Sequence, residues 1–246
     1  MCAVLGLLLT LAFGWSIFFD RATTYNRAYE PVAWRNEPAD KIFPDELSAY
    51  DGTSSATDRK QQMSWVRAGI AQDTSCASGL DGKALQTASA HDCKAVLRAT
   101  YVDALNSQVA TVALVVLGDT AQDEYGSTPN GPLADAISES GDGRDGTLHA
   151  PKVAYSVRAY GVKGTPAANW TDSRRNASAA KVSGDNYVIA VTAGATDGRL
   201  AARLPAPWNS YGVQAPNVKD RSTYTEAAKG LTESEIMGSI YDKDDE

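Results

Sequence analysis

The first nineteen residues of the chain carry no charged side chain. They read MCAVLGLLLTLAFGWSIFF, and Asp20 and Arg21 follow at once. As a helix, a segment of this length rises about 28 Å, close to the ~30 Å hydrocarbon core of a bilayer. Aromatic residues crowd its C-terminal end, as is typical of a membrane–water boundary. The pattern predicts a transmembrane anchor over residues 1–19.

A cleaved signal peptide and a buried core helix are the alternatives for this segment. A signal peptide needs a basic start and a small-residue cleavage site, but there is no Lys or Arg before Asp20 and no A-x-A motif. A core helix usually has a polar face, whereas the polar side chains here are Thr10 and Ser16. We therefore expect a membrane span.

Small residues recur along this span. Gly6, Thr10 and Gly14 are four positions apart, so they lie on one face of the helix. Small residues on such a face allow a second helix to approach closely. We take this as a helix-contact face; the alternative is that Gly and Thr are simply common in membrane spans.

The chain after the span begins with a polar segment. Residues 20–57 contain three prolines, which predicts a juxtamembrane stalk. Met63, Val66 and Ile70 then follow at helical spacing, so a helix is expected over 58–72. A second short helix is expected over 81–90.

The strongest strand signal lies in the middle of the chain. Residues 95–104 and 109–117 are rich in β-branched side chains and are separated by Asn106-Ser107-Gln108, which predicts a hairpin. The second strand is almost entirely apolar, so we expect it to be buried on both faces. Further elements are expected as strands over 152–160 and 187–193, a turn at Asp197-Gly198 and a final amphipathic helix over 223–241.

This order of elements predicts an α+β fold, with an antiparallel sheet packed against helices. The expected domains are an anchor (1–19), a stalk (20–57), an extracytoplasmic domain (58–241) and an acidic tail (242–246). The order resembles that of NTF2-like and VirB8-like periplasmic domains, which implies a domain anchored by one N-terminal helix. The resemblance rests on element order, so no functional residue is carried over from it.

The composition restricts the partners of this domain. The 246 residues are 43% hydrophobic and 22% charged, with a net charge of −7. This is ordinary globular composition, and an acidic surface without a basic stripe would repel a phosphate backbone. We therefore expect no nucleic acid partner.

Two of the three cysteines are candidates for a disulfide. Cys76 and Cys93 lie seventeen positions apart, whereas Cys2 lies in the apolar N-terminal segment. A disulfide would place the domain outside the cytoplasm; the alternative is a pair of reduced, packed cysteines. The arginines that follow the span favour the opposite orientation by the positive-inside rule. We expect the domain to be extracytoplasmic.

No catalytic, cofactor or metal motif is recognisable. Asp142 and Asp145 lie in a glycine-rich loop, but their spacing matches no calcium loop. An acidic group after the central strand (Asp119, Asp123 and Glu124) is typical of a helix N-terminus. Trp208 and Tyr211 are the expected contact residues for a partner, because Trp and Tyr are favoured at interfaces. Packing against the domain is their alternative role.

The leading interpretation is a non-enzymatic, single-pass envelope protein. Its extracytoplasmic domain would bind another protein or help to assemble a membrane complex. A ligand-binding or sensory ectodomain is the first alternative, with a pocket in the concavity of the sheet. A carboxylate-based enzyme of unfamiliar type is the second.

Overall fold

The computed structural model describes residues 30–50, 62–118, 133–134, 156–183, 186–199 and 223–232. Two short helices, α2 (Glu30–Asn36) and α3 (Ala39–Ile42), belong to one compact unit. All the other described elements belong to a second unit, which starts at Phe43.

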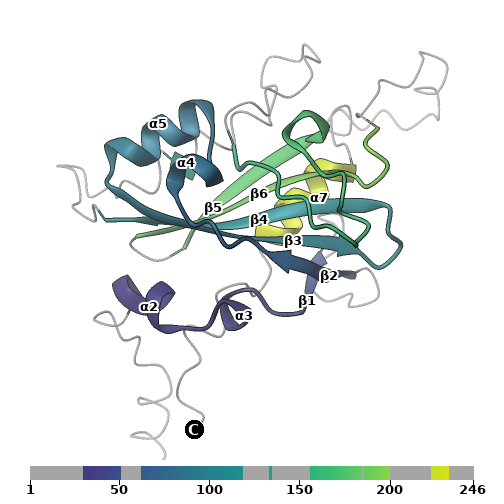
Figure 1. Ribbon diagram of the computed structural model, residues 1–246, viewed down its shortest axis with the longest axis horizontal. Helices are drawn as coiled ribbons and strands as arrows, with labels where there is room; N and C mark the ends of the chain where they lie inside the picture. The colour runs from purple at the N-terminus through teal and green to yellow at the C-terminus, as the bar shows by residue number, and fades with distance from the viewer. Residues whose placement is uncertain are drawn as a thin grey trace, which may run out of the picture. The chain divides into compact units, whose positions relative to one another are not determined.

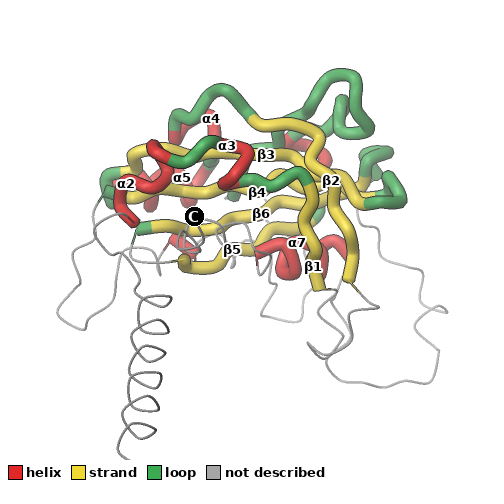
Figure 2. Tube along the Cα trace, turned by 90° about the horizontal axis from the view of Figure 1, so that it is seen from below, coloured by secondary structure: helices red, strands yellow, loops and turns green. Residues whose placement is uncertain are grey.

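The second unit is built around a six-stranded antiparallel sheet with the strand order β1-β2-β3-β4-β6-β5 (Figure 1). The sheet is curled, and Figure 2 shows β1 and β2 bending round at the end where α7 lies. The strands are β1 (Glu46–Tyr50), β2 (Gln62–Ile70), β3 (Cys93–Asp103), β4 (Gln108–Leu117), β5 (Ala177–Ser183) and β6 (Tyr187–Ala195), and the helices are α4 (Cys76–Gly79), α5 (Gly82–Ala90) and α7 (Thr223–Thr232).

The hairpin of β3 and β4 confirms the strongest sequence prediction. Its turn is fixed by Asp103, whose carboxylate accepts the backbone N–H groups of Ser107 at 2.6 Å and Gln108 at 2.9 Å. Asn106 adopts a φ of 55°, which asparagine tolerates better than most residues. The predicted strand 187–193 is also confirmed, as β6. Every residue of β4 and β6 is buried, so the two central strands are covered on both faces.

The two faces of the sheet carry different cores. The first face presents Val96, Arg98, Thr100 and Val102 of β3 and is covered by α4 and α5, as Figure 1 shows. Leu80, which follows α4, packs there with Ala84 and Ala88 of α5 against Val115 and Val188. The opposite face presents the alternate residues of each strand, and α7 packs against β5 and β6. Its buried side chains include Tyr101, Leu114, Tyr187 and, from β2, Trp65.

The helix predicted over 58–72 is wrong for residues 62–70, which form β2. The side chain of Val66 is 48% exposed, whereas that of its neighbour Trp65 is fully buried. This alternation is that of a strand. The pairing of β2 with β1 on one side and β3 on the other replaces the intrahelical hydrogen bonds that the spacing suggested.

The strand predicted over 152–160 is also wrong in its described part. Val157 makes one isolated bridge with Leu80, and residues 158–160 have no regular structure. This stretch crosses the first face of the sheet, and its backbone is bonded by side chains and by α4 rather than by a neighbouring strand.

Two strands were not predicted at all. β1 lies within the segment expected to be a stalk, and β5 has the sequence ASAAKVS, which is poor in β-branched residues. Both are edge strands whose structure depends on one neighbour. The helix expected over 81–90 is confirmed by α5, and the final helix is confirmed over the described residues of α7.

None of the helices in the described part of the chain is long and apolar enough to cross a membrane. The anchor predicted over residues 1–19 lies outside the described residues. The helix-contact face of Gly6, Thr10 and Gly14 therefore stays a prediction.

Candidate functional site

A row of buried hydroxyl groups crosses the first face of the sheet. The strand register aligns one hydroxyl from each of four neighbouring strands: Thr100, Thr111, Thr192 and Ser178. Residues 156–176, here named the covering segment, lie over this row. Thr100 and Thr111 of this row form hydrogen bonds with the covering segment, which pairs with no strand in the described structure.

Thr111 is the main contact of the covering segment. Its Oγ1 accepts the indole N–H of Trp170 at 2.8 Å and the backbone N–H of Tyr160 at 3.1 Å. The Oγ1 of Thr100 lies 3.1 Å from that of Thr111 and donates to the carbonyl of Tyr160 at 2.5 Å. Since Thr100 donates its proton to Tyr160, the proton between the two threonines comes from Thr111. The two hydroxyls thus form a chain of hydrogen bonds, in which Thr111 donates to Thr100 and Thr100 donates to the carbonyl of Tyr160.

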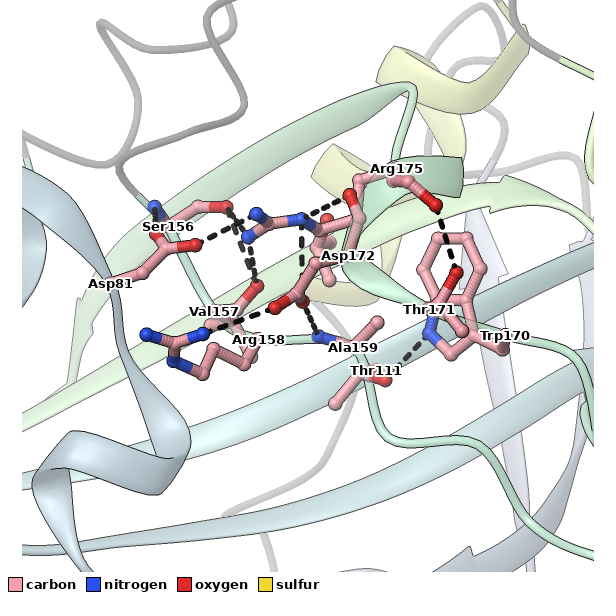
Figure 3. A network of polar contacts seen from close by, with 12 residues as sticks. Asp81, Thr111, Ser156, Val157, Arg158, Ala159, Trp170, Thr171, Asp172 and Arg175 are labelled. Carbon is pink, nitrogen blue, oxygen red and sulfur yellow. Dashed lines mark hydrogen bonds and ion pairs between the residues drawn. The ribbon is translucent and has the colours of Figure 1, made fainter.

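Arg175 is the centre of a polar network beside this row (Figure 3). Its side chain is 6% exposed, and Nη2 binds the carboxylate of Asp81 at 2.7 Å. The Nη1 group donates to the carbonyl of Val157 at 2.8 Å, and Nε donates to the carbonyl of Asp172 at 3.0 Å. A buried guanidinium is tolerated when its donors are used in this way.

Asp81 connects the network to the start of α5. One of its carboxylate oxygens accepts from Arg175, and the other accepts the backbone N–H of Ser156 at 2.9 Å. The backbone N–H of Asp81 in turn donates to the carbonyl of Ser156 at 3.1 Å. The carboxylate of Asp81 therefore joins the covering segment to the start of α5.

Asp172 does the same within the covering segment. Its Oδ1 accepts the backbone N–H of Ala159 at 2.7 Å, and its Oδ2 accepts Nη1 of Arg158 at 3.2 Å (Figure 3). Arg158 also donates from Nε to the carbonyl of Leu80 at 3.1 Å. The carboxylates of Asp81 and Asp172 thus each bind a backbone N–H group of the covering segment. The chemical role of this arrangement is to hold that segment in position.

Arg98 is the exception in this cluster. It is 6% exposed, yet within the described ranges its guanidinium makes a single long hydrogen bond, from Nη1 to the carbonyl of Arg158 at 3.4 Å. Its Nε is buried and has no hydrogen-bond partner among the same residues. The ring of Tyr160 lies 5.8 Å from the guanidinium carbon. Burial lowers the pKa of Arg98, and the charges of Asp73 and Asp172 partly oppose that effect.

Asp73 lies at the edge of this cluster and is exposed. Its carboxylate accepts the backbone N–H of Ser75 at 2.9 Å, and this hydrogen bond is the main reason that the pKa of Asp73 lies below its usual value. No ion pair joins Asp73 to Arg98 among the described residues. Asp73 therefore acts on Arg98 through its charge alone.

The predicted disulfide is present. Cys76, at the start of α4, is bonded to Cys93, at the start of β3. The bond holds α4 against the sheet, next to the residues that anchor the covering segment. A disulfide suggests an oxidising, extracytoplasmic location.

The other predicted site residues lie outside the described residues. These are the helix-contact face (Gly6, Thr10, Gly14), the expected partner contacts (Trp208, Tyr211) and the two acidic groups (Asp119, Asp123, Glu124; Asp142, Asp145). Within the described ranges, no group of three or more His, Cys, Asp or Glu side chains is arranged to hold a metal ion.

The polar cluster was missed by sequence reasoning. It consists of Asp81, Arg98, Arg158, Asp172 and Arg175, which come from three separate stretches of chain, so no local motif contains them. One signal was available: Arg98 is a charge in the middle of a strand whose neighbours are apolar or β-branched. Charged side chains are rarely fully buried without a partner, so this position marks an unusual environment.

Comparisons of the chain with protein-family models, with curated proteins and with solved structures found no match.

Proposed function

We propose that this chain is a single-pass, membrane-anchored envelope protein whose extracytoplasmic domain mediates protein–protein interaction or the assembly of a membrane complex. The observation that carries the proposal is the disulfide between Cys76 and Cys93, in a chain that begins with nineteen uncharged residues. The disulfide argues for export, and the apolar segment argues for retention at the membrane.

The anchor offers one surface for a partner. Gly6, Thr10 and Gly14 share a helix face with small side chains, which favours close packing against another membrane helix. The aromatic residues Trp208 and Tyr211 are proposed as contacts outside the membrane.

The folded domain offers a second kind of surface. β1 and β5 are the edge strands of the sheet, and edge strands can pair with a strand from another chain. Val182 of β5 is 39% exposed, beside an exposed lysine. We also propose that the domain resembles NTF2-like and VirB8-like domains. The curled antiparallel sheet supports this part of the proposal.

The first test addresses location. Native membranes are alkylated without reductant, digested, and analysed by mass spectrometry for the linked Cys76–Cys93 peptide. The proposal expects the linked peptide in the membrane fraction, with the Cys76→Ser variant as the blank. An unlinked pair in native membranes would place the domain in the cytoplasm and overturn the proposed orientation.

The second test addresses the partner. The full chain, tagged at its C-terminus, is crosslinked in its native membranes and purified in mild detergent. A defined set of neighbouring proteins should co-purify with the chain. These proteins should be absent when residues 1–19 are exchanged for an unrelated membrane helix. They should also be absent when the edge-strand residue Val182 is replaced by proline. A chain that runs alone under these conditions contradicts the assembly role.

A further inference from the structure

The polar cluster on the first face contains more positive than negative charge. Its guanidinium groups belong to Arg98, Arg158 and Arg175, whereas its carboxylates belong to Asp81 and Asp172. Both carboxylates are already bound by Arg158 and Arg175. One positive charge in the described cluster, that of Arg98, is left without a paired anion.

The position of Arg98 makes this imbalance costly. Only 6% of the surface of Arg98 is exposed, and its Nε is buried without a hydrogen-bond partner among the described residues. A buried charge is normally paired with an opposite charge or bound by several hydrogen bonds. In the part of the chain that the structure describes, Arg98 has one long hydrogen bond and the ring of Tyr160 as its partners.

A second guanidinium adds to the cost. Arg158 lies close enough to repel the charge of Arg98, while its own side chain remains 41% exposed. The charge of Asp73 also acts on Arg98, but Asp73 is at the surface and its carboxylate accepts the backbone N–H of Ser75. Asp172 is paired with Arg158, and its charge also acts on Arg98, so the two guanidinium groups share the charge of one carboxylate. Guanidinium groups bind the oxygens of carboxylates and phosphates well.

We propose that Arg98 and Arg158 bind a small oxyanion, a carboxylate or phosphate group of a ligand, at the outer edge of the covering segment. The exposed guanidinium of Arg158 makes the first contact, and the Nη groups of Arg98 bind the same anion from the side of the sheet. The free Nη donors of a guanidinium match the oxygens of either group. The site does not depend on the proposed role at the membrane.

The test uses the full chain purified in mild detergent. Inorganic phosphate and acetate are titrated separately against chloride at constant ionic strength, and the thermal unfolding midpoint and the arginine Nε–H NMR signals are recorded. The site predicts a saturable rise of the midpoint with at least one of the two anions, together with movement of the Arg98 and Arg158 signals. The anion that binds more tightly identifies the ligand group.

Three variants decide the assignment. Arg158→Gln, at a partly exposed position, should weaken anion binding about tenfold or more, as expected for the loss of a charged hydrogen bond. Arg98→Met should abolish the binding, whereas Arg199→Met, which removes an exposed arginine paired with Asp197, should leave it unchanged. If neither anion gives a saturable change, or if Arg158→Gln binds as tightly as the natural chain, the proposed site is wrong.

Discussion

Arg98 and Arg175 lie on the same face of one sheet but differ in how their burial is compensated. Arg175 uses its donors on a carboxylate and on backbone carbonyls, whereas Arg98 has no paired carboxylate in the described part of the protein. Breaking a paired, buried charge leaves the partner uncompensated, while removing an unpaired charge removes its desolvation cost. The same substitution should therefore cost much more stability at Arg175 than at Arg98.

We expect Arg175→Met to lower the free energy of unfolding by about 3–5 kcal/mol, because it leaves Asp81 buried without its cation. Arg98→Met should cost less than about 1 kcal/mol or should be stabilising in buffer without oxyanions. Urea unfolding followed by tryptophan fluorescence measures both. Equal losses in the two variants would show that Arg98 is a structural residue like Arg175.

Tyr101 gives a second prediction at the residue scale. Its ring is fully buried and its hydroxyl donates to the carbonyl of Pro44 at 2.9 Å. Burial raises the pKa of Tyr101 above its ordinary value of 10.0. The neutral form is thus favoured in the folded protein, so its contribution to stability is complete below pH 10 and is lost as the pH rises further.

Tyr101→Phe should cost about 1 kcal/mol at neutral pH through the lost hydrogen bond. Above pH 10, the gap between the natural chain and the variant should shrink, because phenylalanine does not ionise. Denaturant unfolding at a series of pH values measures that gap, and the remaining tyrosines cancel in the comparison. A gap that stays constant to pH 11 would contradict the assignment.

At the scale of elements, the first face shows how an irregular segment is held on a sheet. The covering segment is fixed by side chains from β3, β4 and the start of α5, and by the backbone of α4. The position of α4 is therefore critical. Gly79 allows it to lie directly on β3, because a Cβ at this position would overlap the side chain of Val96.

We expect Gly79→Ala to destabilise the domain by about 1–3 kcal/mol, as overpacking in a core does. Val96→Ala should relieve that clash, so the double variant should lose less than the sum of the single losses, by about 1 kcal/mol. Gly164→Ala combined with Val96→Ala serves as the control and should be additive, since a Cβ at Gly164 meets nothing within 4 Å. Additivity in the first pair would show that α4 is not packed on β3 as described.

At the scale of the whole molecule, the proposals on the membrane concern residues 1–19 and their helix-contact face. Replacing Gly14 by Leu puts a large side chain where close approach of a second helix is proposed. We expect Gly14→Leu to reduce self-association or complex recovery in mild detergent, while Leu8→Ile, at a position off that face, leaves both unchanged. Chemical crosslinking followed by gel analysis measures the effect. Unchanged recovery with Gly14→Leu would remove the contact face.

The sequence by itself determined the elements whose signal is local. The β3–β4 hairpin, β6 and α5 were predicted because β-branched runs, a turn and a helical pattern each depend on a few neighbouring residues. The disulfide was predicted from two cysteines seventeen positions apart. The tertiary structure alone decided the rest. β2 became a strand because β1 and β3 supply its hydrogen bonds, and Arg98, Asp81, Asp172 and Arg175 met because distant segments fold onto one face. Contacts between residues far apart in the chain produce no periodic pattern in the sequence. The cluster around Arg98 could therefore be recognised only in the tertiary structure.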